Sequence, residues 1–285
     1  MKRYVMPIAC IAGLCLCSCG GNSDENPDKE IYEAVSASSF SYVSDNATGV
    51  GLVFEGPTYR IKYDEDALTA EIKMENIRFS DKMSPTSYVF SNVPFSVDSR
   101  TGTKIIDVAR LTPDSDNTPV FTDVEILAQP LKKIDEVEMD GVTVSYGVNG
   151  SVSVTNVPYR AVFEGATETV NSASGSAYVS TETNYVVDID PRTMTGVLKV
   201  NNAAFAAEMP KLGTMEFAGL AVTIVDGGYI LTSDELVPSI AGTPYPRYTV
   251  TNLRMKVDLN SGSELEFTCM GVFAVDAVFE AVYTP

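Results

Sequence analysis

Apolar and polar residues alternate along most of the chain after its N-terminal segment. From 59 to 63 the odd positions are apolar and the even ones charged, whereas from 68 to 75 the even positions are apolar. Four residues, 64–67, separate these two runs. Successive side chains of a strand point to opposite faces, so the pattern predicts two half-buried antiparallel strands joined by a hairpin. Nothing with a helical period exceeds about two turns, and we therefore expect an all-β fold.

The alternating pattern occurs twice along the chain. Shifting the sequence by 126 residues places Tyr59 on Tyr185 and Lys73 on Lys199. The same shift pairs Asp64 with Asp190, Asn76 with Asn202, Phe79 with Phe205 and Met83 with Met209. With one residue of slippage, Phe121 falls on Tyr248 and Ile126 on Leu253, and the letters of Ala161–Glu164 return at Ala277–Glu280. We therefore predict an internal duplication of a unit of about 120 residues.

Each repeat contains about eight candidate strands, which suits a small closed barrel or a two-sheet sandwich. Periodicity does not distinguish these two architectures. The predicted repeats span 39–166 and 167–285, with 161–164 and 277–280 as their last strands. The first repeat is the longer, and we place its extra residues in a loop at Leu131–Glu136.

The N-terminus reads as an export signal. Lys2 and Arg3 give it a positive start, and Val5–Leu16 is an apolar core too short to span a bilayer, so 1–18 is predicted to be a signal peptide. The next residues, Leu16-Cys17-Ser18-Cys19, resemble a bacterial lipobox. This resemblance implies cleavage before Cys19 and a covalent lipid on its sulfur, which would be the only attached cofactor and the contact with the membrane.

The segment 19–38 is polar and acidic, and it predicts a flexible tether that cannot bury a core. Ser23, Asp24 and Glu25 follow the lipobox cysteine closely. Acidic residues at this place resemble the export signal of Bacteroidota surface lipoproteins. The resemblance implies a chain anchored in the outer membrane and displayed on the cell surface.

Composition excludes several partners and chemistries. The chain has 20 basic and 38 acidic side chains, a net charge of −18, so it repels nucleic acid and anionic headgroups. It has no His, which removes the usual general base of Ser and Cys nucleophiles and the commonest zinc ligand. It also has no Trp, the preferred stacking platform for sugars and cations. Only Cys269 lies in the predicted folded part, where we interpret it as a small buried hydrophobe.

Two duplicated Phe–Met pairs are candidate pocket or plug residues. Phe79 and Met83, like Phe205 and Met209, stand four apart and precede a proline. This spacing predicts one helical turn with both side chains on one face. The pair either plugs the end of its core or forms the floor of an apolar ligand pocket.

Other polar residues have both structural and functional interpretations. By alternation Asn76 and Asn202 point inward, where they either satisfy a turn or contact a ligand. The cluster Asp64–Asp66 could hold Ca²⁺, but the second repeat has Asp190, Pro191 and Arg192 there, so we favour a turn held by the shared Asp. We likewise interpret Pro113–Asn117 as a solvated loop.

The size and hairpin-rich pattern of each repeat are similar to calycin-like barrels of lipoproteins. From the sequence we expect a non-enzymatic binding or scaffold protein for a glycan, a protein or an apolar small molecule. The alternatives are a calycin-like carrier with an apolar ligand inside its barrel and a carboxylate-based hydrolase. A carrier needs an internal cavity, a scaffold needs a filled interior, and a glycan binder needs exposed Tyr at loop tips or on a sheet face.

Overall fold

The structure is a computed structural model that describes residues 34–36, 38–115, 118–134, 137–207, 209, 211–225, 227–259 and 262–279. The predicted signal peptide and Cys19 lie outside these residues. The described part of the chain is almost entirely strand, which confirms the predicted all-β fold. None of its residues belongs to a helix long and apolar enough to cross a membrane.

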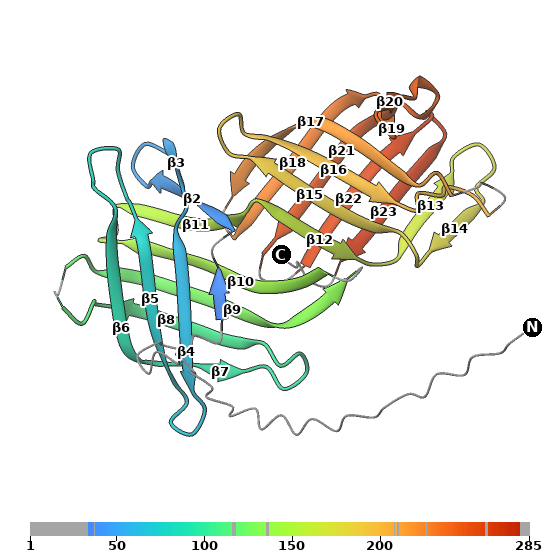
Figure 1. Ribbon diagram of the computed structural model, residues 1–285. Coiled ribbons are helices and arrows are strands. Elements are labelled where there is room, and N and C mark those ends of the chain that lie inside the picture. The colour runs from blue at the N-terminus through green and yellow to red at the C-terminus, as the bar shows by residue number, and fades with distance from the viewer. Residues whose placement is uncertain are drawn as a thin grey trace, which may run out of the picture. The chain divides into compact units, whose positions relative to one another are not determined.

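The first half of the chain forms two antiparallel sheets (Figure 1). The smaller has the order β1-β4-β5-β6, and the larger has the order β3-β2-β11-β10-β9-β8-β7. Their strands are β1 (Ala34–Ser36), β2 (Ser39–Asp45), β3 (Gly51–Glu55), β4 (Thr58–Asp64), β5 (Thr69–Ile77), β6 (Thr86–Pro94), β7 (Ser96–Val97), β8 (Lys104–Leu111), β9 (Phe121–Ile134), β10 (Val137–Val148) and β11 (Val152–Pro158).

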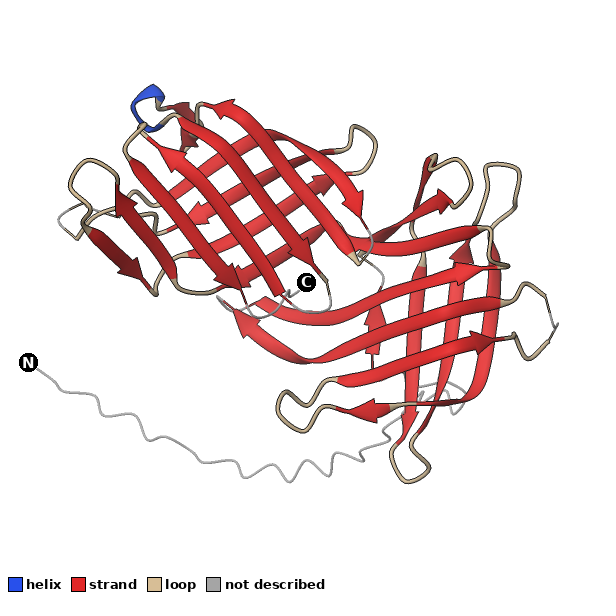
Figure 2. Ribbon diagram, turned by 180° about the vertical axis from the view of Figure 1, so that it is seen from behind, coloured by secondary structure: helices blue, strands red, loops and turns tan. Residues whose placement is uncertain are grey.

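The second half forms one curved antiparallel sheet with the order β12-β15-β16-β17-β18-β21-β22-β23-β13-β14 (Figures 1 and 2). Two short strands extend it, because β19 pairs with β17 and β20 pairs with β19. The elements are β12 (Arg160–Glu164), β13 (Thr167–Asn171), β14 (Ala177–Ser180), β15 (Asn184–Asp190), β16 (Thr195–Asn201), β17 (Thr214–Val225), β18 (Gly228–Leu236), β19 (Ser239–Ile240), β20 (Thr243–Pro244), the 3₁₀ turn η1 (Pro246–Tyr248), β21 (Val250–Asp258), β22 (Gly262–Cys269) and β23 (Phe273–Phe279).

The pairing of strands repeats between the halves. Strand β1 pairs with β4 as β12 pairs with β15, and β2 pairs with β11 as β13 pairs with β23. The halves differ at β17, a long strand that pairs with both β16 and β18. In the first half the corresponding segment is divided into β6, which pairs with β5, and β7, which pairs with β8 in the other sheet. One unbroken strand therefore joins in the second half what stays as two sheets in the first.

Residues 161–164 form the first strand of the second half, and not the last strand of the first repeat as predicted. Ala34 stands opposite Ile61, and Ala161 stands opposite Val187 in the same way. The letters of 161–164 thus belong to the opening strand β12 of the second half, and the predicted end of the first repeat at 166 is too late. The predicted tether is also too long, because β1 lies within 19–38. A match of four letters cannot distinguish two strands with similar apolar composition.

Two β-bulges correct the alignment of the later strands. Asp123 and Asn252 both have positive φ, 48° and 56°, where the pairing register shifts. Each stands two residues after the first residue of its strand, so Phe121 corresponds to Val250 and not to Tyr248. An inserted bulge residue leaves no apolar signature, and the sequence pattern missed it for that reason.

The extra residues of the first half lengthen a hairpin. Strands β9 and β10 have 14 and 12 residues, against 9 and 8 in β21 and β22. The predicted loop at 131–136 was therefore wrong for Leu131–Ile134, which belong to β9, while 135 and 136 lie outside the described residues.

The inward faces of the sheets carry large side chains packed into two clusters. One cluster gathers inward residues of β2, β4 to β6 and β8 to β11, and the other is formed mainly by the second half and also takes in Phe40 and Val157. The largest fully buried side chains are Tyr59, Tyr185, Tyr229, Phe40, Phe90, Phe121, Phe163, Phe217, Ile61, Ile72 and Met74. Each such side chain contributes about 1.5–3 kcal/mol by leaving water. Among the described residues, aromatic rings and long aliphatic chains therefore occupy the inward positions of the sheets.

Candidate functional site

The Phe–Met pairs form the same local structure in both halves. The amide of Met83 donates to the carbonyl of Ser80 at 3.1 Å, and the amide of Met209 donates to that of Ala206 at 3.1 Å. Each Met sulfur then accepts the amide of its Phe at 3.4 Å. These are single β-turns, so the predicted helical turn is wrong. Among the described residues each turn shows one i to i+3 hydrogen bond, and in the first half Pro85 has no amide hydrogen with which to continue a helix beyond Ser84.

The side chains of these pairs pack against the cores. Phe79 has its ring centroid 6.1 Å from that of Tyr88, 5.9 Å from Phe121 and 6.4 Å from Tyr146. Phe205 is only 3% exposed and lies 6.2 Å from Phe267. Both residues thus contact other rings at ordinary aromatic distances. No ligand is needed to explain their positions.

Asn76 and Asn202 are exposed, and the predicted inward orientation is wrong. Both have positive φ, 59° and 56°, which ends the alternation of the strand and turns the side chain outward. Asn76 Nδ2 donates to the carbonyl of Gly56 at 2.7 Å, and Asn202 Nδ2 donates to that of Glu182 at 3.3 Å. Asn tolerates this left-handed backbone better than most residues. Each side-chain amide thus holds the backbone of a neighbouring turn by a hydrogen bond.

The acidic loops also have structural bonds. Asp64 Oδ1 accepts the amide of Ala67 at 3.0 Å, and Asp190 Oδ1 accepts that of Arg192 at 2.9 Å. In the Pro113–Asn117 segment, Asp114 accepts the amide and the hydroxyl of Ser91 at the edge of β6. Within the described part of the chain, no three His, Cys, Asp or Glu side chains lie in an arrangement that could hold a metal ion.

Cys269 is buried in the second core, as its interpretation as a small hydrophobe requires. Burial raises the pKa of its thiol to about 12. Its sulfur lies 3.7 Å from the carbonyl oxygen of Tyr248, to which the thiol donates. A thiol in this environment stays protonated and unreactive at neutral pH.

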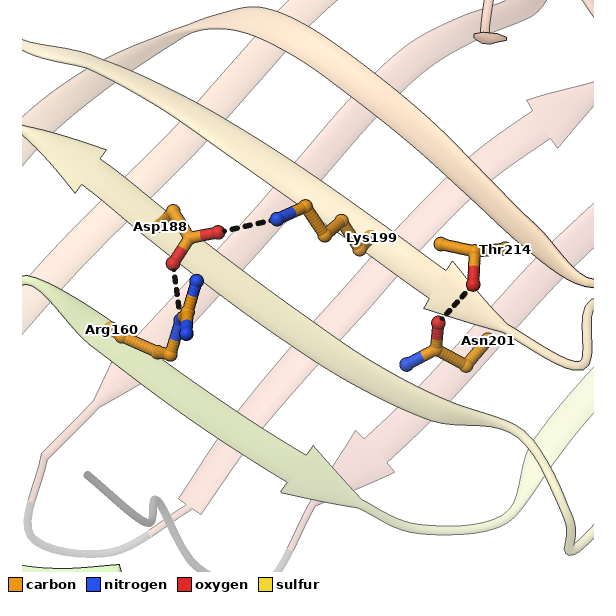
Figure 3. A network of polar contacts seen from close by, with 5 residues as sticks. All are labelled: Arg160, Asp188, Lys199, Asn201 and Thr214. Carbon is orange, nitrogen blue, oxygen red and sulfur yellow. Dashed lines mark hydrogen bonds and ion pairs between the residues drawn. The ribbon is translucent and has the colours of Figure 1, made fainter. Parts of the chain in front are cut away.

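A row of outward polar side chains crosses β12, β15 and β16 (Figure 3). Asp188 accepts from Arg160 Nε at 2.5 Å and from Lys199 Nζ at 2.9 Å. Burial by itself would raise the pKa of Asp188, but the bonds from the two cations outweigh it and the pKa lies below its ordinary value. This group links three strands, and its geometry is that of a structural ion pair.

The outer face of the second sheet has a groove of about 410 Å³. It runs over β13, β23, β22 and the start of β21. The polar groups on its wall are the carboxylates of Glu168, Glu266 and Asp276, the amide of Asn252 and the hydroxyl of Thr268. The other lining residues are Val170, Phe267, Ala274 and Val275.

Strand register brings the three carboxylates together. Asp276 stands opposite Glu168 on one side and opposite Glu266 on the other. Like charges directly opposite one another reduce the stability of a sheet. Next in the row is Arg254, which stands opposite Glu266. These acids are far apart in the sequence, and the sequence analysis missed them because only the register of β13, β23 and β22 makes them neighbours.

The chain matches no protein-family model, and no curated protein or solved structure is significantly similar to it.

Proposed function

We propose that the chain is a lipid-anchored surface protein of the bacterial outer membrane that binds its partner on the outside of its sheets and catalyses no reaction. The observation that carries this proposal is the filled interior. Tyr59, Phe90 and Phe121 in one half and Tyr185, Phe217 and Tyr229 in the other are less than 2% exposed and occupy inward positions.

A filled interior argues against the carrier alternative. A barrel that carries an apolar ligand needs inward residues small enough to leave a cavity of several hundred Å³. Here the inward positions of neighbouring strands hold aromatic rings in mutual contact, such as Phe90 and Phe121 with centroids 5.0 Å apart. Any partner would then meet the outer surface and the loops.

The groove over β13, β23, β22 and β21 supports binding from outside. Its wall combines carboxylate, amide and hydroxyl groups with the methyl groups of Val170 and Ala274. Such a surface suits a ligand rich in hydroxyl or amino groups. The carboxylates Glu168 and Asp276 are exposed, which suits binding of such a ligand at the surface.

The lipid anchor rests on Leu16–Cys19 and the acidic residues that follow. A protein held by several acyl chains stays on its membrane, whereas one chain binds only marginally. The test is to express the full chain in a Bacteroidota host with an alkyne analogue of palmitate. We expect the wild type to be labelled and to be degraded by protease added to intact cells.

The matched control is Cys19→Ala, which should be neither labelled nor retained by the membrane. Cys17→Ala removes the neighbouring cysteine and should still be labelled. An unlabelled wild type would contradict the anchor, and a chain that resists protease until the cells are broken would contradict surface display.

A further inference from the structure

The connection between β18 and β21 carries two tyrosines that the corresponding connection of the first half lacks. It spans 237–249, thirteen residues, whereas β8 and β9 are joined by the nine residues 112–120. The shorter connection contains no aromatic residue. The longer one contains Tyr245, which directly precedes the η1 turn, and Tyr248, which is the last residue of that turn (Figure 2, blue). The loop is thus an addition to one copy of a duplicated fold.

The two rings form a supported and partly exposed surface. Tyr245 is 40% exposed, and its ring centroid lies 6.4 Å from that of Tyr248 with an angle of 40° between the planes. Tyr248 is half-buried and packs against the core of the second half. The inner ring therefore holds the outer one, which keeps an apolar ring and a phenol group available at the loop.

The loop is held in one conformation by its own backbone. The amide of Tyr245 donates to the carbonyl of Pro238 at 2.8 Å, and that of Tyr248 donates to the carbonyl of Tyr245 at 2.9 Å. Thr249 Oγ1 donates to the carbonyl of Pro246 at 2.7 Å. Short strand pairing of β19 with β17 fixes the start of the loop. A surface ordered in advance loses less conformational entropy when it binds a ligand.

Arg247 adds a donor to the same turn. It is exposed, and none of the ion pairs among the described residues includes it. A guanidinium presents five N–H donors in a plane. Two aromatic rings and this fork of donors stand within four consecutive residues, 245–248.

We propose that Tyr245, Arg247 and Tyr248 form a contact site for a neutral glycan. A pyranose ring has one face of C–H groups and an edge of hydroxyl groups, so the first can stack on Tyr245 while the second accepts bonds from Arg247. A polyanion is disfavoured by the net charge of −18. This inference rests on the proposed function, because it requires that ligands meet the outer surface.

The test uses the mature chain, 19–285, extracted with its lipid in detergent. Native gels containing starch, mannan, xylan or, as an acidic comparison, polygalacturonate report binding as retardation. We expect at least one neutral polysaccharide to retard the protein and polygalacturonate not to. Titration calorimetry with the hexasaccharide of that polymer then measures the dissociation constant for each variant.

Tyr245→Ala should weaken the binding of that hexasaccharide about tenfold, in the range of a contact that matters in an interface. Tyr245→Phe, which keeps the ring, should stay within about threefold of wild type, and Arg247→Gln should weaken binding by an intermediate amount. The matched control is Tyr178→Ala on β14, a half-buried tyrosine outside the loop, which should bind as wild type. Circular dichroism of each variant checks that the sheet is folded.

Three results would overturn the glycan site: no retardation by any neutral polysaccharide, unchanged affinity in Tyr245→Ala, or equal losses in Tyr245→Ala and Tyr178→Ala. None of these results bears on the proposed lipid anchor or on surface display, which the labelling and protease experiments test separately. If a protein partner instead binds the chain through the same tyrosines, the ligand of this site is a protein and the glycan site is wrong.

Discussion

Each half buries a pair of neighbouring hydroxyl groups at equivalent positions of the duplicated fold. The Tyr59 hydroxyl lies 3.3 Å from that of Ser41, and the Tyr185 hydroxyl bonds that of Thr167. Burial raises the pKa of both phenols, so both are protonated at neutral pH. The tyrosine match is visible in the sequence. The match between their partners, Ser41 and Thr167, is not visible, because the two residue types differ and share only the hydroxyl group.

The Asp188 ion pair predicts a pH-dependent stability. The pKa of Asp188 is lower in the folded chain than its unfolded value of about 3.9. Its contribution is therefore complete above about pH 4 and is lost as the pH falls through the folded pKa. We expect Asp188→Asn to lower the free energy of unfolding at pH 7 by roughly 1 kcal/mol, as for other partly exposed charged pairs.

Urea unfolding at pH 7 and near pH 3 measures this difference, which should shrink at the lower pH because wild-type Asp188 is then increasingly protonated. Lys62→Gln is the control, since Lys62 stands 126 residues earlier at the same place in β4 and makes none of these bonds. A loss of stability in Asp188→Asn that is equal at both pH values would refute the assignment.

At the scale of elements, hairpins follow from alternation but bulges do not. The hairpin of β4 and β5 has the predicted alternation, with Tyr59, Ile61, Ile72 and Met74 buried. Asn76 ends that alternation, and its positive φ reverses the direction of its side chain. A single residue in left-handed conformation has no apolar period, so strand ends and bulges could not be placed from the sequence.

The acidic row in the groove predicts a gain of stability on removing its central charge. Asp276 faces Glu168 and Glu266, and no like-charge contact of this kind stabilises a sheet. Asp276→Asn should therefore raise the free energy of unfolding by roughly a few tenths of a kcal/mol at low ionic strength. The gain should fade at about 1 M salt, where the Debye length is about 3 Å.

The matched control lies on the same face of β22. Glu264 stands opposite Lys256, so Glu264→Gln removes an attraction and should change the stability in the opposite direction. Urea unfolding at two salt concentrations measures both variants. If Asp276→Asn is destabilising at low salt, the carboxylate has a structural role. The acidic row would then no longer support the groove as a binding surface.

At the scale of the whole molecule, the filled interior predicts that the protein purifies without a ligand. Native mass spectrometry of the Cys19→Ala chain, which lacks the lipid, should give the mass of the polypeptide alone. A second mass that dissociates on collisional activation would instead indicate a carried molecule. Detergent-washed and unwashed samples serve as paired controls, because an adsorbed lipid is removed by washing and an enclosed one is retained.

The sequence by itself determined the all-β class and the duplicated hairpins, because alternation and repetition are properties of neighbouring residues. It also contains Leu16–Cys19, the segment on which the proposed lipid anchor rests. Only the tertiary structure decided the rest. Pairing between strands placed β12 in the second half and brought Glu168 beside Asp276. The conformation of the 237–249 connection brought the ring of Tyr245 against the half-buried ring of Tyr248. Register and bulges depend on contacts across strands, and those contacts have no signature in a single strand.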